Sequence, residues 1–249
     1  MNKRTFSDLK TSAKQILSGS YWTSFAVCLL FGIFISLASN IVSWLIAAPL
    51  TFLTTLFLSV SASVEAAAET IDVLTPLIAM LYMFIALIPV YLFAQYPLYT
   101  GTVKHFLNTT NGNGRINDLF FAYKNHPGNV ILISFLKSLY IFLWSLLFCI
   151  PGIIKTYQYS MIEFILAENP AINRKKAFHI SKELTRGNKF RIFLFQFSFI
   201  GWFLLGALAF GIGVNFVYPY LYASMTQLYI DLRENALAEG RVSPEDFAY

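Results

Sequence analysis

Long apolar runs alternate along this chain with short polar stretches that hold almost all of its positive charge. Sixteen of the 18 Lys and Arg residues fall in four stretches, at 3–14, 101–128, 168–191 and 233–241. Runs of about 20 apolar residues are long enough to cross a bilayer as helices, and basic residues concentrate on the cytoplasmic side. The pattern predicts a polytopic membrane protein with all four stretches and both termini in the cytoplasm.

The boundaries of the apolar runs predict six transmembrane helices. We place them at 22–46, 73–97, 129–149, 154–167, 190–210 and 214–230. Breaks containing Gly at 150–153 and 211–213 separate the last four into two hairpins. The predicted fold class is all-α, with six transmembrane helices arranged as three hairpins. In this arrangement Lys155 is the one basic residue outside, at an external turn.

The segment 47–72 is ambiguous, because an apolar part at 52–60 is followed by Glu65, Glu69 and Asp72. A membrane span here would place the most basic stretch, 168–191, outside the cell, against the charge rule. We therefore expect an external loop with an apolar helix lying at the membrane interface, although partial insertion stays open.

A short amphipathic segment precedes each predicted hairpin, at 6–17, 116–123 and 171–184. The sequence KQILSGSYW at 14–22 aligns without gaps to KELTRGNKF at 182–190, and each has a glycine where a helix would end. We interpret the chain as a single integral membrane domain over 1–249, with possible repeats at 5–100, 115–168 and 171–233. Any helix that leads into a membrane span could produce the same pattern.

Composition supports a membrane protein and argues against a nucleic-acid-binding one. Hydrophobic residues make up 57% of the chain and charged residues only 12%, about half of the usual share in soluble domains. The net charge of +5 comes from basic residues that flank apolar runs. This position suits the cytoplasmic membrane surface and anionic lipid headgroups.

Three pairs of polar residues lie symmetrically about the predicted hairpin turns. Folding at 150–151 brings Lys137 and Glu163 to similar depth, and charges inside a membrane are costly unless paired or hydrated. We expect these two to face each other or share a polar cavity, as a hairpin register pair or an ion site; alternatively, Lys137 extends to the interface. The remaining pairs, both expected to be structural, are Gln196 with Gln227 and Arg191 with Asp231.

The segment 171–189 predicts a basic surface helix. Its apolar positions include Ala177, Ile180 and Leu184, and its other faces carry positive charge. Such a helix is typical of proteins that bind anionic lipid headgroups, and a docking site for a cytoplasmic partner is the alternative. The candidate headgroup contacts are Arg174, Lys175, Lys176, Lys182 and Arg186.

The sequence gives little support for catalysis. His105, His126 and His179 belong to no zinc-protease spacing, and there is no nucleophile elbow, Walker or dinucleotide motif. The acids are too scattered to indicate a metal site. We therefore expect no enzymatic activity, no cofactor and no metal.

Several motifs in order resemble a known family. They are FLWSLLFCIPGIIK at 142–155, YQYSM at 157–161, ILAENP at 165–170, SKEL at 181–184, FIGW at 199–202 and Pro219-Tyr220. This region is similar to the bacterial membrane-protein family known as domain of unknown function 975 (DUF975). The resemblance implies an inner-membrane location, and it supplies no reaction and no catalytic residues. Related membrane domains are fused to glycerophosphodiester phosphodiesterases, whose soluble catalytic domain has no counterpart here.

Two functional hypotheses are favoured over a third, a membrane-embedded enzyme, for which the sequence offers no constellation of catalytic residues. The first is a non-enzymatic bacterial inner-membrane protein that acts through the lipid bilayer, anionic lipids or a protein partner, for example in envelope maintenance, stress response or peptide-toxin immunity. The second is a small transporter or channel component with a polar path near Lys137, Glu163, Gln196 and Gln227. A water-filled cavity that reaches mid-membrane would favour the second.

Overall fold

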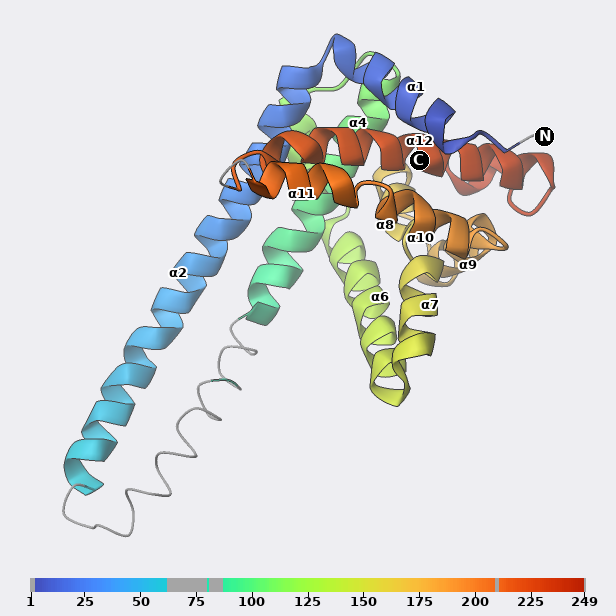
Figure 1. The fold of residues 1–249 in the computed structure, drawn as a ribbon. Helices are drawn as coiled ribbons and strands as arrows, with labels where there is room; N and C mark the ends of the chain where they lie inside the picture. The colour runs from blue at the N-terminus through green and yellow to red at the C-terminus, as the bar shows by residue number, and fades with distance from the viewer. Residues whose placement is uncertain (1–2, 62–79, 81–86, 209–210, 249) are drawn as a thin grey trace. The chain divides into compact units, whose positions relative to one another are not determined.

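The computed structural model describes residues 3–61, 80, 87–208 and 211–248, and every regular element among them is helical (Figure 1). The all-α prediction is therefore confirmed for this part of the chain. The helices are α1 (Phe6–Ser18), α2 (Tyr21–Ser61), η1 (Tyr91–Gln95), α4 (Tyr96–Thr110), η2 (Ile116–Phe120), α5 (Phe121–Lys124), α6 (Pro127–Leu147), α7 (Cys149–Gln158), α8 (Ile162–Glu168), α9 (Arg174–Thr185), α10 (Lys189–Phe197), α11 (Ile200–Leu208), α12 (Val214–Ala238) and η3 (Pro244–Asp246).

The chain forms two compact units. The larger unit comprises Met1–Phe31 and Tyr96–Tyr249, and the smaller one is Gly32–Gln95. Helix α2 begins in the larger unit and supplies most of the described part of the smaller one. The two units do not coincide with the three repeats predicted from the sequence.

Helix α2 is longer than the sequence predicted. It runs without interruption for 41 residues and contains Pro49, so at 1.5 Å per residue it extends about 60 Å, twice the hydrocarbon thickness of a bilayer. The helix expected from the apolar sequence at 52–60 is present, but the predicted break at residue 47 is wrong, because this helix continues α2 without interruption as far as Ser61. The rest of the ambiguous segment lies outside the described residues, as does most of the predicted span at 73–97.

Three helical segments among the described residues are long and apolar enough to cross a membrane: Tyr21–Leu45 in α2, Pro127–Leu147, which is α6, and Lys189–Leu208, which covers α10 and α11. They correspond to the first, third and fifth predicted spans. The described residues therefore support a membrane protein with three candidate spans rather than six.

The fourth predicted span, 154–167, is wrong as a single helix. The chain turns at residues 159–161 between α7 and α8, and α8 is only 7 residues long. Residues 162–167 are all buried within the protein. This segment is apolar because protein covers it, so hydropathy alone misplaced it in lipid.

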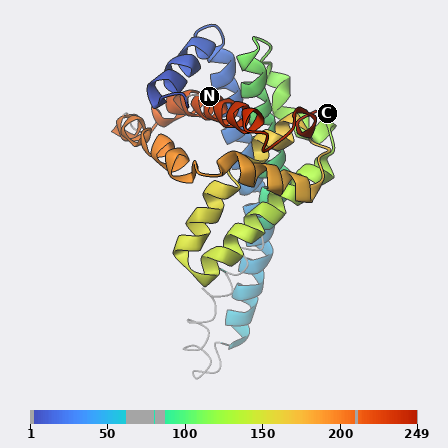
Figure 2. The same cartoon turned by 90° about the vertical axis from the view of Figure 1, so that its right-hand side faces the viewer.

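The predicted external position of Lys155 is also wrong. Its Nζ donates a hydrogen bond to Gln158 Oε1, and Lys189 Nζ of the most basic stretch donates to the same oxygen. Lys155 therefore lies at the level of the basic stretch. Helix α7 is only 10 residues long, includes Lys155 and lies antiparallel beside α6 (Figure 2).

The predicted sixth span falls within α12, which continues to Ala238 and is not one of the three candidate spans. Its buried positions include Thr226, Gln227, Asp231 and Asn235. Helix α1 packs along it, with Leu9, Ala13 and Leu17 buried at helical spacing. The α1 start is capped by Thr5, whose hydroxyl accepts from the Asp8 N–H at 3.2 Å.

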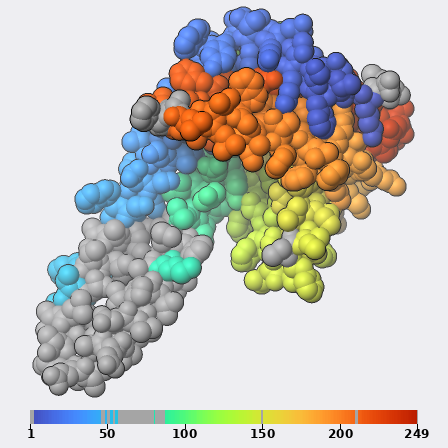
Figure 3. All heavy atoms as spheres, in the orientation of Figure 1, coloured from blue at the N-terminus to red at the C-terminus, as the bar shows by residue number. Residues whose placement is uncertain are grey.

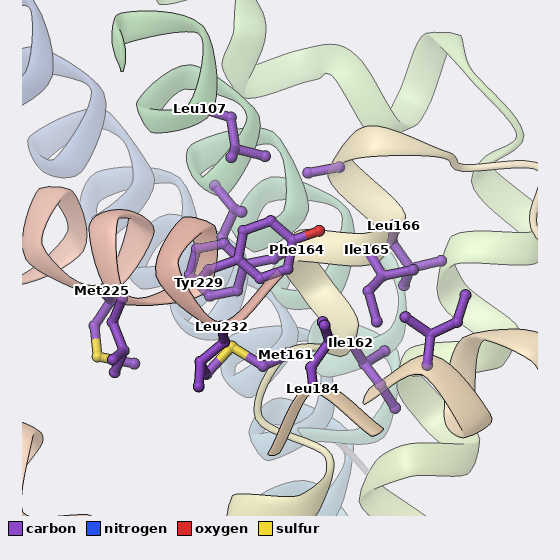
Figure 4. Close-up of a cluster of buried hydrophobic side chains, with 14 of the residues drawn as sticks. Leu107, Met161, Ile162, Phe164, Ile165, Leu166, Leu184, Met225, Tyr229 and Leu232 are labelled. Carbon is purple, nitrogen blue, oxygen red and sulfur yellow. The ribbon is translucent and has the colours of Figure 1, made fainter. Parts of the chain in front are cut away.

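The core of the larger unit forms around α8. Phe164 of α8 stacks on Tyr229 of α12, with ring centroids 4.9 Å apart, and α4 and α9 cover other sides (Figure 4). Helix α4 approaches η2 so closely that a Cβ on Gly101 would lie 1.9 Å from the Leu119 carbonyl oxygen. Glycine is thus required at this crossing.

Candidate functional site

The structure brings Lys137 and Glu163 together as an ion pair between α6 and α8. Their side chains are 18% and 5% exposed. A carboxylate buried this deeply needs a partner, because losing water is costly for the charged form. The pair fixes the start of α8 against the middle of α6.

A second ion pair holds the other end of α8. Glu168 pairs with Arg233 of α12 and accepts a hydrogen bond of 2.6 Å from the Tyr229 hydroxyl. The Arg233 guanidinium also lies over the rings of Tyr229 and Phe247, at 5.8 and 5.7 Å from their centroids. Sequence reasoning missed this cluster, although Glu168 stands in the ILAENP motif.

Arg191 and Asp231 pair as expected, with Nη1 and Oδ2 2.8 Å apart. The N-terminal segment joins them: Arg191 donates to the Arg4 carbonyl at 2.7 Å, and the Arg4 N–H donates to Asp231 at 3.3 Å. Arg4 also reaches Glu234 at 3.3 Å. These bonds attach the N-terminus to α10 and α12, which the sequence pattern did not indicate.

Gln196 and Gln227 do not form the predicted pair. Gln196 Nε2 lies 3.9 Å from Met225 Sδ, and Gln227 Nε2 lies 3.5 Å from Thr110 Oγ1. The two residues are equally far from the turn at 211–213, but this does not bring their side chains together, because α12 buries Gln227 against α4. Of the four residues proposed to line a polar path, only Lys137 and Glu163 bond each other.

His105, which the sequence linked to no catalytic motif, lies in a Ser–His–Asp arrangement. His105 Nε2 is 3.1 Å from Ser24 Oγ, and Nδ1 is 3.0 Å from the Arg115 carbonyl and 3.8 Å from Asp118 Oδ2. The carbonyl requires a proton on Nδ1, so Nε2 accepts. Burial lowers the pKa of His105, whereas the Arg115 carbonyl and Asp118 oppose this. Ser24 and His105 are both fully buried, so the arrangement joins helices and offers a substrate no access.

The basic surface of α9 is exposed as a group. Asn173 caps the helix by accepting from the Lys175 N–H at 3.0 Å, and the opposite face buries Ala177, Ile180 and Leu184. Lys176 pairs with Asp246 at 2.7 Å and Arg186 with Glu183 at 3.4 Å. The five predicted headgroup contacts, Arg174, Lys175, Lys176, Lys182 and Arg186, all face solvent.

Two open hollows adjoin this surface. Arg174 and Lys175 border one of about 680 Å³ that is lined by the rings of Tyr140, Tyr159 and Phe178. Lys182, Arg186 and Lys189 border another of about 560 Å³. Within the described residues, no group of three or more His, Cys, Asp and Glu side chains could hold a metal ion.

A comparison with known protein families finds a match over the region from α7 to α12. Residues 146–236 match the model of a family described as "Protein of unknown function (DUF975)". This segment is similar to DUF975. The family predicted from the sequence motifs is thus confirmed over this segment, which is less than half of the chain. No curated protein and no solved structure matches the chain.

The DUF975 segment contains most of the features described above. It starts near the end of α6 and includes α8, the basic helix α9 and α12 up to Ala236. Both acids of α8 lie in it, together with Arg191, Asp231 and Arg233. Lys137, His105 and Arg4 lie before it, so the partners that hold α8 and α12 come partly from outside the matched segment.

Proposed function

We propose that the chain is a multi-pass protein of the bacterial inner membrane that acts without catalysis, by binding anionic lipids on its cytoplasmic face. The observation that carries this proposal is the exposed basic surface of α9, placed directly before the candidate span Lys189–Leu208. Lys and Arg at this position attract the negative surface of the cytoplasmic leaflet, at about 1 kcal/mol per residue.

The orientation belongs to the same proposal. Both termini and the four basic stretches lie in the cytoplasm, which requires an even number of complete crossings. The three apolar helices enter the bilayer, and they are therefore not the full set of crossings in this topology. A role in envelope maintenance, stress response or peptide-toxin immunity fits a protein that acts through lipids or a protein partner. The transporter alternative is less well supported, because among the described residues Gln196 and Gln227 bond elsewhere and do not converge with Lys137 and Glu163.

Lipid binding by the purified full-length protein tests the function. We expect fluorescent phosphatidylglycerol to bind more tightly than fluorescent phosphatidylcholine, and the preference to weaken as salt rises. Replacing Arg174, Lys175, Lys176, Lys182 and Arg186 by Gln should remove most of the preference. A control variant that removes three basic residues elsewhere, with Lys14, Arg115 and Lys124 replaced by Gln, should keep most of it. Equal binding of the two lipids by the wild type would refute the proposal.

Cysteine labelling in intact cells tests the orientation. In a variant with Cys28 and Cys149 replaced by Ala, single cysteines at Lys124 and Arg241 should resist a membrane-impermeant maleimide until the cells are opened. Labelling of either position in intact cells would contradict a cytoplasmic location.

A further inference from the structure

Three lysines from three helices gather at the junction of α7, α9 and α10. Lys155 Nζ and Lys189 Nζ donate to the same oxygen, Gln158 Oε1, at 3.3 and 3.4 Å. Lys182 is close enough for its charge, like that of Lys189, to act on Lys155. Within the described residues, none of the three forms a salt bridge with a carboxylate. The cluster therefore concentrates positive charge that the protein itself does not neutralise.

The backbone that carries these lysines is fixed. The Gln158 carbonyl accepts hydrogen bonds from Ser181 Oγ at 2.9 Å and Thr185 Oγ1 at 3.3 Å, so the end of α7 is attached to α9. Gly187, with φ of +69°, then turns the chain directly into α10. Because mutual repulsion would separate free lysines, a rigid junction that holds them together indicates a site for an anion.

A hollow opens beside the cluster. It has a volume of about 560 Å³, and Lys182, Lys189 and Phe190 are among its lining residues. Glu183 also lines it, together with Arg186, which pairs with this acid at 3.4 Å. The lining thus keeps a net positive charge, and the space accommodates a phosphate group with its substituent.

Apolar surface begins where the cations end. Phe190 is 70% exposed and Phe197 56% exposed on α10, which lies at the surface of the larger unit (Figure 3). Phe193 lies between them along the helix and contacts Tyr157 of α7, with centroids 5.8 Å apart. Ile153 and Ile154 on α7 are exposed as well. A ligand that fits both surfaces has an anionic head and an apolar tail.

We propose that Lys155, Lys182 and Lys189 bind the phosphate of an anionic phospholipid, whose acyl chains lie along the exposed aromatic side chains of α10. This site rests on the proposed function and makes it more specific. It places the main lipid contact at one end of α9 rather than along the whole helix. Lys155 lies over the rings of Trp144 and Tyr159, at 5.1 and 5.6 Å from their centroids, which keeps its ammonium in place.

The test compares two triple variants of the full-length protein in detergent micelles. One replaces Lys155, Lys182 and Lys189 by Gln, and the matched control replaces Lys14, Arg115 and Lys124, which lie outside the α9 surface, by Gln. Binding of fluorescent phosphatidylglycerol should fall on the order of tenfold or more in the first variant and about twofold or less in the control. Replacing the same three lysines by Arg keeps the charge and should restore binding, which separates loss of the site from misfolding.

Each outcome is decisive. Equal losses in the two Gln variants would overturn the localised site and leave a diffuse basic surface, so the proposed function would stand. A wild type without preference for phosphatidylglycerol over phosphatidylcholine would overturn both. Inorganic phosphate or glycerol 1-phosphate that displaces the lipid at equal concentration would identify a soluble phosphate ligand and overturn the lipid assignment. Failure of the Arg variant to bind, with its fold retained, would also count against the site.

Discussion

Helix α8 and the tip of the α6–α7 hairpin are both short and apolar, yet they have opposite surroundings. In α8, Phe164 is 2% exposed and Ile165 is fully buried, whereas Leu147 and Phe148 at the tip are 65% and 71% exposed. The comparison shows that hydropathy identifies segments that avoid water without saying what covers them. Protein covers α8, whereas the tip is exposed, and under the proposed membrane location lipid accepts its apolar side chains without cost.

Charge distinguishes the two regions better than hydropathy does. Helix α8 has an acid at each end, and each acid pairs with a cation from another helix, Lys137 of α6 or Arg233 of α12. The tip at 146–150 contains no charged residue. An apolar segment bounded by buried ion pairs therefore belongs to a protein core, because these charges require partners close by.

The largest expected effect tests the packing contrast directly. Ile165→Ala should lower the free energy of unfolding by about 3 kcal/mol, because it leaves a cavity among packed side chains. Leu147→Ala at the exposed tip should change it by less than about 0.5 kcal/mol. Unfolding in micelles, followed by circular dichroism, measures both. A similar loss in the two variants would show that another protein surface covers the tip.

A smaller effect is expected from the ion pair that begins α8. Lys137→Met alone should destabilise the protein by about 2 kcal/mol, because Glu163 stays buried without a partner. Combined with Glu163→Gln, the change should be milder than the sum of the two single changes by about 1 kcal/mol or more. The same unfolding assay on all four proteins gives this coupling. Simple additivity would mean that the two side chains are independent.

The smallest effect is the dependence of stability on pH that His105 contributes. This residue lies in α4, beyond residue 97, where the predicted membrane span ends. Burial lowers its pKa below the ordinary value of 6.5, so the folded state binds this proton less readily than the unfolded state does. The stabilisation that the neutral His105 ring contributes is fully present above pH 6.5, the pKa in the unfolded state. It is lost as the pH falls from there through the lower pKa of His105 in the folded state.

Melting temperatures measured between pH 7.5 and pH 5 check this dependence. The wild type should become less stable toward pH 5, and His105→Gln should reduce the slope. His179→Gln is the matched control, because His179 is exposed on α9 and should leave the slope unchanged. A slope that persists in full in the His105 variant would place the titrating group elsewhere.

Several elements could be predicted because local chemistry specifies them. The Thr5–Asp8 capping box marks the start of α1, and the spacing of Ala177, Ile180 and Leu184 identifies the buried face of α9. Symmetry about a turn placed Lys137 near Glu163, since antiparallel helices in contact bring such residues to similar height. The same reasoning failed for Gln196 and Gln227, because α12 packs against α4 as well as against α11.

The amino-acid sequence was enough to predict the helical class, the three candidate spans, the family match over residues 146–236 and the concentration of basic residues in a few stretches. These depend on composition and short-range periodicity, which a chain carries wherever it folds. The packing of the helices was needed to show that 162–167 is a protein core, that Arg4, Glu168 and His105 have partners far along the chain, and that Lys155 joins Lys182 and Lys189. Burial and charge pairing depend on which helices meet, and a linear pattern of apolar residues does not specify those contacts.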